Sequence, residues 1–232
     1  MGSEYMGDAF WQILHRYEDL LKGGYQTHID DSPLELKREE SKSGASHLLS
    51  MEDLEKSIEG CRACNLFSTR SSILLGKGNP QSGIFIIASN PTMEDDDFGE
   101  ILHGEEGAYL EKWFSSIGLK LMQDCYVTSL VKCMTPGGRV ALADELTNCL
   151  VFLKQQIRLV SPKVIVALGP YVYATLTGRN NASFENEIKA LCASATFMDV
   201  KVLPLYHPAT VLKNLSLRRP VWNCLNYLKE LL

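Results

Sequence analysis

Four cysteines have the number and spacing of a metal-binding set. Cys61 and Cys64 form a C-x-x-C pair, Cys133 follows an apolar run, and Cys149 lies within a helical pattern further along. A tetrahedral zinc ion and an iron–sulfur cluster both take four such ligands. Spacing alone fits unrelated buried thiols equally well, because free cysteine packs as a small hydrophobe. That is the role we expect for the other three cysteines: Cys125, Cys192 and Cys224.

A second candidate site lies where an apolar run ends in a sharp turn. The run Ile84–Ala88 predicts a buried strand. Ser89-Asn90-Pro91 ends it, because proline lacks an amide donor and disfavours helix in the residue before it. Open α/β sheets place their chemistry at the C-terminal ends of strands. The turn is therefore the expected position of a site, although asparagine before proline is also common in purely structural turns.

The acidic residues 94–97 follow this turn. Their composition resembles a cation site, but like charges this close repel each other unless a cation is present. We therefore expect them to form a solvated loop.

The elements that must position these residues alternate along the chain. Apolar, β-rich runs predict strands at 72–75, 83–88, 125–131, 164–168 and 200–205. Helical spacing predicts helices at 108–117, 144–159, 171–176 and 220–231. Alternating strands and helices predict a three-layer α/β/α fold whose central sheet is mostly parallel and has four to five strands.

The N-terminal part has a different pattern. Residues 7–22 have apolar side chains at helical spacing, and 25–45 is polar and reads as a linker. A further helix is predicted over 46–58, with Ser50 as N-cap and Asp53 three residues on. We expect a segment 1–45, whose helix docks on its own domain or on a partner, and a domain 46–232.

Composition limits the class of protein. A chain of 232 residues with 45% hydrophobic side chains can form one substantial core. It has neither a membrane-length apolar run nor a secretory signal pattern, so we expect a soluble, cytoplasmic protein. We also expect a monomer that binds no membrane. The net charge of −5 argues only weakly against nucleic-acid binding, since one basic patch suffices. In a reducing compartment, cysteines favour metal or redox use over disulfides.

Together these residues resemble family 4 uracil-DNA glycosylases, the iron–sulfur branch of the uracil-DNA glycosylase superfamily. The resemblance covers roughly 55–232 and rests on the cysteine spacing and on the segments VKCMTP, ELTNCLVFLKQQI, PKVIVALG and YHPATVLKNLSLRRPVW. It implies a [4Fe–4S] cluster, with zinc as the alternative. The implied ligands are Cys61, Cys64, Cys133 and Cys149.

The first signature of that family is changed here. Ser89 stands where the family has a glutamate, Leu102 where an aromatic ring stacks on the base, and Ser129 where an asparagine reads the uracil edge. Asn90-Pro91 is instead similar to the catalytic turn of the mismatch-specific and single-strand-selective branches. The implied substrate-binding residues are Ala88, Ser89, Pro91, Leu102, His103 and Ser129.

The resemblance also implies roles in catalysis. An enzyme must extrude the nucleotide to reach its glycosidic bond. Asn90 would then orient the attacking water, and His207 would donate to the departing base. The residues implied to contact DNA are Pro208, Ala209, Lys213, Arg218 and Arg219.

We therefore expect a monofunctional DNA glycosylase that acts on uracil or another deaminated base in DNA. The alternative is a non-catalytic member of the fold that binds DNA or a nucleotide. Taken singly, Asn90 and His207 fit structural roles as well as catalytic ones.

Overall fold

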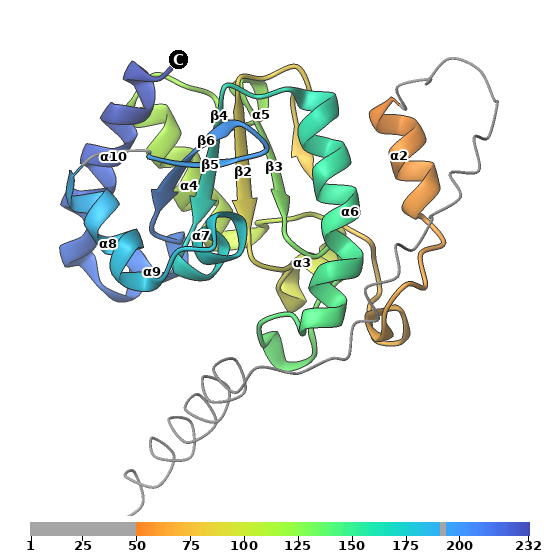
Figure 1. The fold of residues 1–232 in the computed structure, drawn as a ribbon. Coiled ribbons are helices and arrows are strands. Elements are labelled where there is room, and N and C mark those ends of the chain that lie inside the picture. Colours follow the sequence, from red (N-terminus) through yellow and green to blue (C-terminus); the bar gives the residue numbers. More distant parts are fainter. Residues whose placement is uncertain (1–49, 191–193) are drawn as a thin grey trace, which may run out of the picture. The chain divides into compact units, whose positions relative to one another are not determined.

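The computed structural model describes residues 50–190 and 194–232 (Figure 1). The expected helix at 7–22, the linker at 25–45 and Cys192 lie outside the described residues. Within them, helix α2 (Met51–Ile58) begins as predicted, because Ser50 and Asp53 cap each other's backbone amides. No helix in the described part of the chain is long and apolar enough to cross a membrane.

A mostly parallel sheet forms the centre of the fold, as predicted. The described residues contribute six strands in the order β1-β3-β2-β4-β6-β5. The central four pair in parallel, whereas β1 and β5 are antiparallel edges. The strands are β1 Lys77–Gly78, β2 Ile84–Ala88, β3 Cys125–Ser129, β4 Val164–Leu168, β5 Ala195–Phe197 and β6 Val200–Leu205.

The expected number of four to five strands is wrong because of the two short edges. Residues 72–75 form no strand; the Leu74 amide bonds to the Lys132 carbonyl, and the Leu75 carbonyl accepts from side chains. The edge pairing is made two residues later, by β1. At the other edge, β5 joins β6 through Met198 and Asp199, both with positive φ. Such a hairpin turn usually contains glycine or asparagine.

Helices cover both faces of the sheet. The connections from β2 to β3 and from β3 to β4 run in opposite directions across it, and right-handed crossovers then place their helices on opposite faces. Accordingly α6, which packs on α2, and the pair α4–α10 lie on different sides (Figure 1). The remaining bounds are α3 Met93–Phe98, α4 Gly104–Ser116, α5 Leu121–Asp124, α6 Ala143–Val160, α7 Pro170–Thr177, α8 Asn181–Ala190, α9 Pro208–Lys213 and α10 Arg218–Glu230.

The core explains why the central strands are continuous apolar runs. Strands β2, β3 and β4 are buried at every position, as expected for strands covered on both faces. A second, smaller core of Leu54, Ile58 and Leu75 lies under α2. Of the cysteines expected in the core, Cys125 and Cys224 are indeed buried.

The acidic residues 94–97 do not form a solvated loop; they lie within helix α3. Thr92 and Asp95 form a capping box, and the Asp95 carboxylate also accepts the His103 amide at 2.6 Å. Asp96 accepts the amides of Ser71 and Ser72 at 2.7 and 3.0 Å. Backbone amides from three segments thus donate to these two buried carboxylates. The carboxylates are satisfied by these donors and need no cation to offset their charge.

Candidate functional site

The C-terminal ends of the parallel strands bring the predicted site residues to one edge of the sheet. Asn90 follows β2, Ser129 ends β3 and His207 follows β6. Strand β4 lies between β2 and β6, so Asn90 and His207 come from either side of it. Gly169 follows β4 with φ +94, and a Cβ atom there would stand 3.9 Å from the His207 Cβ. A glycine therefore suits both the backbone and the space beside the histidine.

The side-chain amide of Asn90 is held in one orientation. Its Nδ2 donates to Thr135 Oγ1 at 3.0 Å and to the Pro91 carbonyl at 3.3 Å. Within the described residues no hydrogen bond reaches its Oδ1. Asn90 is half-buried, so this oxygen remains an acceptor at the strand end.

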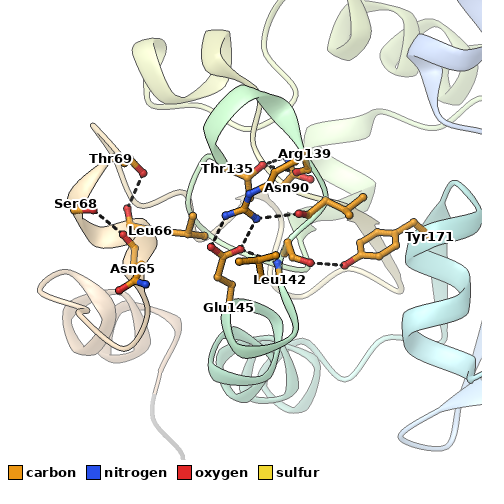
Figure 2. Close-up of polar contacts among 12 residues, drawn as sticks. Asn65, Leu66, Ser68, Thr69, Asn90, Thr135, Arg139, Leu142, Glu145 and Tyr171 are labelled. Atoms are coloured by element: carbon orange, nitrogen blue, oxygen red, sulfur yellow. Dashed lines mark hydrogen bonds and ion pairs between the residues drawn. The ribbon is translucent and has the colours of Figure 1, made fainter. Parts of the chain in front are cut away.

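Behind Asn90 lies a polar network that connects the turn to helix α6 (Figure 2). The Thr135 hydroxyl donates to the Arg139 carbonyl at 2.5 Å. The Arg139 guanidinium forms two bonds of 2.7 Å with Glu145, whose side chain is 2% exposed. Glu145 also accepts the Leu142 amide at 2.8 Å, and the hydrogen bond from Arg139 lowers its pKa.

Sequence reasoning missed this network. The available signals were the glycine pair before Arg139, which indicates a tight turn, and a glutamate at the third position of a helix. Neither signal shows that the turn reaches Asn90.

His207 is a neutral donor at neutral pH. Burial lowers the pKa of His207 to about 4, so the ring is uncharged at neutral pH. Its Nδ1 lies 3.9 Å from Glu106 Oε2, but the two groups form no ion pair at that pH. Its Nδ1 accepts the Ala209 amide at 3.3 Å, and the proton of the neutral ring therefore lies on Nε2. The imidazole can donate from Nε2 without a change of charge.

Glu106 is a second site residue that the sequence did not single out. It lies in the first turn of α4, with a side chain 29% exposed. Burial, followed by the charge of Asp95, raises its pKa. Within the described residues, the polar contact of Glu106 is with His207, whose Nδ1 lies 3.9 Å from Glu106 Oε2. The carboxyl group therefore lies beside the histidine, and no donor in the described part of the chain makes a hydrogen bond to it.

Several residues that were predicted to bind the base are buried in the structure. Ala88 is buried in β2, and Ser129 is fully buried with its hydroxyl donating to the Val131 carbonyl at 2.7 Å. Leu102 is 4% exposed and has φ +50. Its carbonyl oxygen packs against Gly107, where a Cβ atom would lie only 1.8 Å away. Contacts of these side chains with a base stay predictions.

The other predicted pocket residues are more accessible. His103 is half-buried and stacks on Phe98 with a ring separation of 4.1 Å; Phe98 is 67% exposed. Ser89 is half-buried, whereas Pro91 is buried. His103 and Phe98 thus offer an aromatic surface beside the turn.

The residues predicted to contact DNA lie on the segment that follows His207. Pro208 is buried at the start of α9, and the Ala209 amide binds the histidine. Lys213, Arg218 and Arg219 are exposed, and Arg218 Nε donates to the Tyr109 hydroxyl at 3.1 Å. The segment therefore presents three cations close to the histidine in sequence.

The four cysteines predicted as ligands line one small pocket with a cavity volume of about 20 Å³: Cys61, Cys64, Cys133 and Cys149. Donors point at two of the sulfurs. Arg70 Nη1 lies 3.2 Å from Cys133 Sγ, and the Lys132 amide lies 3.3 Å from Cys149 Sγ. Burial raises the pKa of both thiols, that of Cys133 to about 11. Among the described residues, no three His, Cys, Asp or Glu side chains converge closely enough to hold a single metal ion.

Lys132 lies between this pocket and the sheet. Its side chain is fully buried, and its Nζ donates to Thr128 Oγ1 and to the Ser129 carbonyl, both at 2.6 Å. Burial lowers its pKa to about 7. The amine is therefore engaged inside the protein and is directed away from solvent.

The family model and several curated relatives identify one superfamily. The family model described as "Uracil DNA glycosylase superfamily" matches residues 75–229. A type-4 uracil-DNA glycosylase from Archaeoglobus fulgidus is 31% identical over 173 residues, which is 73% of this chain and 86% of the relative. One from Thermotoga maritima is 31% identical over 74% of this chain and 88% of its own. One from Sulfurisphaera tokodaii is 29% identical over 78% and 84%.

Proposed function

Because the chain belongs to the uracil DNA glycosylase superfamily, we propose that it is a monofunctional DNA glycosylase. It hydrolyses the N-glycosidic bond of uracil or another deaminated base in DNA. The observation that carries the proposal is that Asn90 and a neutral His207 lie at the same end of the parallel strands. Among the described residues, no hydrogen bond reaches Asn90 Oδ1 or His207 Nε2. Nothing on the described residues favours the non-catalytic alternative.

The two side chains match the charges that develop during cleavage. As the bond breaks, positive charge grows on the sugar and negative charge on the departing base. Asn90 Oδ1 accepts a hydrogen bond from the attacking water and orients it; an amide is too weak a base to remove its proton beforehand. His207 donates from Nε2 to the base oxygen, and loss of such a donor typically costs about 3 kcal/mol in the transition state.

The positions of the lysines near the site are consistent with hydrolysis by water, without a lysine nucleophile that would form a covalent intermediate. Lys132, close to the end of β3, is buried with its amine bonded to Thr128 and Ser129. It cannot reach the sugar without breaking both bonds. Lys213, Arg218 and Arg219 are exposed and suit contacts with phosphates, which position DNA without reading its sequence.

We propose that Cys61, Cys64, Cys133 and Cys149 hold a [4Fe–4S] cluster. In support, they line one pocket, and the donors from Arg70 and Lys132 suit thiolate sulfurs. When bound, the cluster supplies folding energy by joining the pocket's segments.

The remaining parts of the proposal concern the whole chain. Residues 46–232 form the catalytic domain and act as a monomer on DNA. We place the protein in the cytoplasm, where reducing conditions suit six described cysteines that form no disulfide.

The test is alkaline strand cleavage of end-labelled oligonucleotides that carry uracil, hypoxanthine, xanthine or a mismatched thymine. Anaerobically purified protein should cleave at least one of them. Asn90→Ala and His207→Ala should each remove most of this activity, whereas Asn226→Ala, on the exposed face of α10, should leave it unchanged. Silence on all four substrates, with DNA still bound in a gel shift, would favour the non-catalytic alternative.

A further inference from the structure

The hydrogen bonds around Thr135 determine which end of the Asn90 amide faces the reaction. The Thr135 hydroxyl carries one proton, and it donates that proton to the Arg139 carbonyl at 2.5 Å. Towards Asn90 the same oxygen can only accept. It therefore pairs with the Nδ2 group, at 3.0 Å, and not with Oδ1. We propose that Thr135 is a positioning residue for Asn90, which keeps Oδ1 turned towards the attacking water.

The orientation matters because the two ends of an amide have similar shapes but opposite hydrogen-bonding character. A water that attacks the sugar must direct a lone pair at carbon and give a hydrogen bond to an acceptor. Asn90 Oδ1 provides this acceptor. A flipped amide would present Nδ2, which would occupy the water's lone pair and weaken its attack.

Thr135 can hold this orientation because the Arg139 carbonyl, to which its hydroxyl donates, is itself held in place. The Gly138 amide bonds to the Thr135 carbonyl at 3.0 Å, which closes the turn that leads to Arg139. The Arg139 guanidinium is held by the two bonds to Glu145, near the start of helix α6. Thr135 itself is fully buried, so water cannot replace either partner of its hydroxyl. Figure 2 shows these residues as a continuous chain from Asn90 to Glu145.

The same segment connects the catalytic turn to the cysteine pocket. Cys133 lies two residues before Thr135, and Glu145 lines the pocket together with Cys149. Displacement of this segment would therefore shift Thr135 and, through it, the side chain of Asn90. Three residues outside the Ser89-Asn90-Pro91 turn thus support the Asn90 side chain: Thr135, Arg139 and Glu145.

The inference rests on the proposed function, and its first test is kinetic. Thr135→Val keeps the shape of the side chain and removes the hydroxyl, whereas Thr135→Ser keeps the hydroxyl. On a cleaved substrate, the valine variant should lower the single-turnover rate constant by about 10- to 100-fold, in line with the effect of small misplacements of catalytic groups. DNA affinity should change less than about twofold, because the Thr135 side chain is fully buried and offers no surface to a ligand. The serine variant should stay close to the parent protein.

A double variant separates positioning from general damage. If Thr135 acts through Asn90, then Asn90→Ala combined with Thr135→Val should be no slower than Asn90→Ala alone. Thr196→Val, on the exposed edge strand, is the matched control for a threonine-to-valine change. An unchanged rate in Thr135→Val, or additive losses in the double variant, would overturn the inference. Thr135→Ala replaces the valine variant if that protein does not fold.

A readout independent of activity keeps the inference separate from the proposed function. In protein labelled with ¹⁵N at asparagine, the Asn90 side-chain amide should give shifted, slowly exchanging signals in the parent and in Thr135→Ser. Those signals should move and exchange faster in Thr135→Val. If the parent cleaves no substrate, the proposed function fails, and the amide signals alone decide on Thr135. Identical signals in all three proteins would refute the positioning role.

Discussion

Burial of His207 makes the stability of the folded protein depend on pH in a way that can be calculated. Its pKa falls from 6.5 to about 4 on folding, since burial disfavours the charged ring; the negative charge of Asp95 opposes this only in part. Between these two values the unfolded chain binds more protons than the folded one, so the free energy of unfolding rises with pH across this window. The full contribution is present above pH 6.5 and is lost as the pH falls towards 4.

The size of the effect follows from the shift. With the side chain 21% exposed, little of the shift is lost to solvent screening. At about 1.36 kcal/mol per pKa unit, the shift corresponds to about 3 kcal/mol in total, of which about 2 kcal/mol is lost between pH 8 and pH 5. Glu106 works in the opposite direction, because its raised pKa makes the folded state bind more protons. The parent protein and the His207→Gln variant both retain Glu106, so most of the Glu106 contribution cancels when their stabilities are compared.

The assay is urea unfolding of the parent protein and of His207→Gln at several pH values from 5 to 8, under anaerobic conditions. Glutamine does not titrate, so the variant should lack the His207 contribution, and the stability difference between the proteins should change by about 2 kcal/mol across the range. Its sign is diagnostic: acid should destabilise the parent more than the variant. Parallel curves, or greater acid sensitivity of the variant, would show that His207 is not held neutral by burial.

Three further predictions concern the support of the site. Glu145→Gln should lower the free energy of unfolding, because the Arg139 guanidinium and the Leu142 amide lose their carboxylate acceptor; urea titration measures this, and an unchanged midpoint contradicts it. Asp96→Ala should cost about 2–4 kcal/mol, since two loop amides lose their acceptor, and a loss below 1 kcal/mol would argue against that account. Cys149→Ser should abolish the brown colour and visible absorbance that the proposed [4Fe–4S] cluster would give the protein, whereas Cys224→Ser, which does not line the pocket, should keep both; an equally coloured Cys149→Ser protein would remove that residue from the ligand set.

Residue pattern was enough to predict the fold wherever burial alone decides the structure. The continuous apolar runs of β2 and β4 have few alternatives, because both faces are covered by helices. The pattern failed where conformation depends on a particular turn or cap. Met198 and Asp199 adopt positive φ without the usual glycine, so β5 gave no signal. Helix α3 depends on the Thr92 capping box and on amides donated from distant loops, and its acidic composition suggested the opposite.

The candidate site likewise contains some residues that sequence motifs identify and others that only the tertiary structure reveals. Motifs identify Asn90 and His207 because both lie directly at strand ends, where position in the sequence determines position in the sheet. They do not identify Thr135, which reaches Asn90 across 45 residues of chain. Nor do they identify Glu106, whose proximity to His207 depends on the packing of α4 against α9. Both contacts are products of tertiary structure.

The position of the last residue matters for attaching other molecules to this protein. The Leu232 carbonyl accepts a bond of 2.9 Å from Lys163, which immediately precedes β4, so the chain ends at the amino-terminal edge of the sheet. The site lies at the opposite edge, a strand length of roughly 16 Å away. Figure 1 accordingly shows the C-terminus far from α3, which follows the Asn90-Pro91 turn. A fluorophore, affinity tag or fused protein joined after Leu232 should therefore leave the path of DNA open.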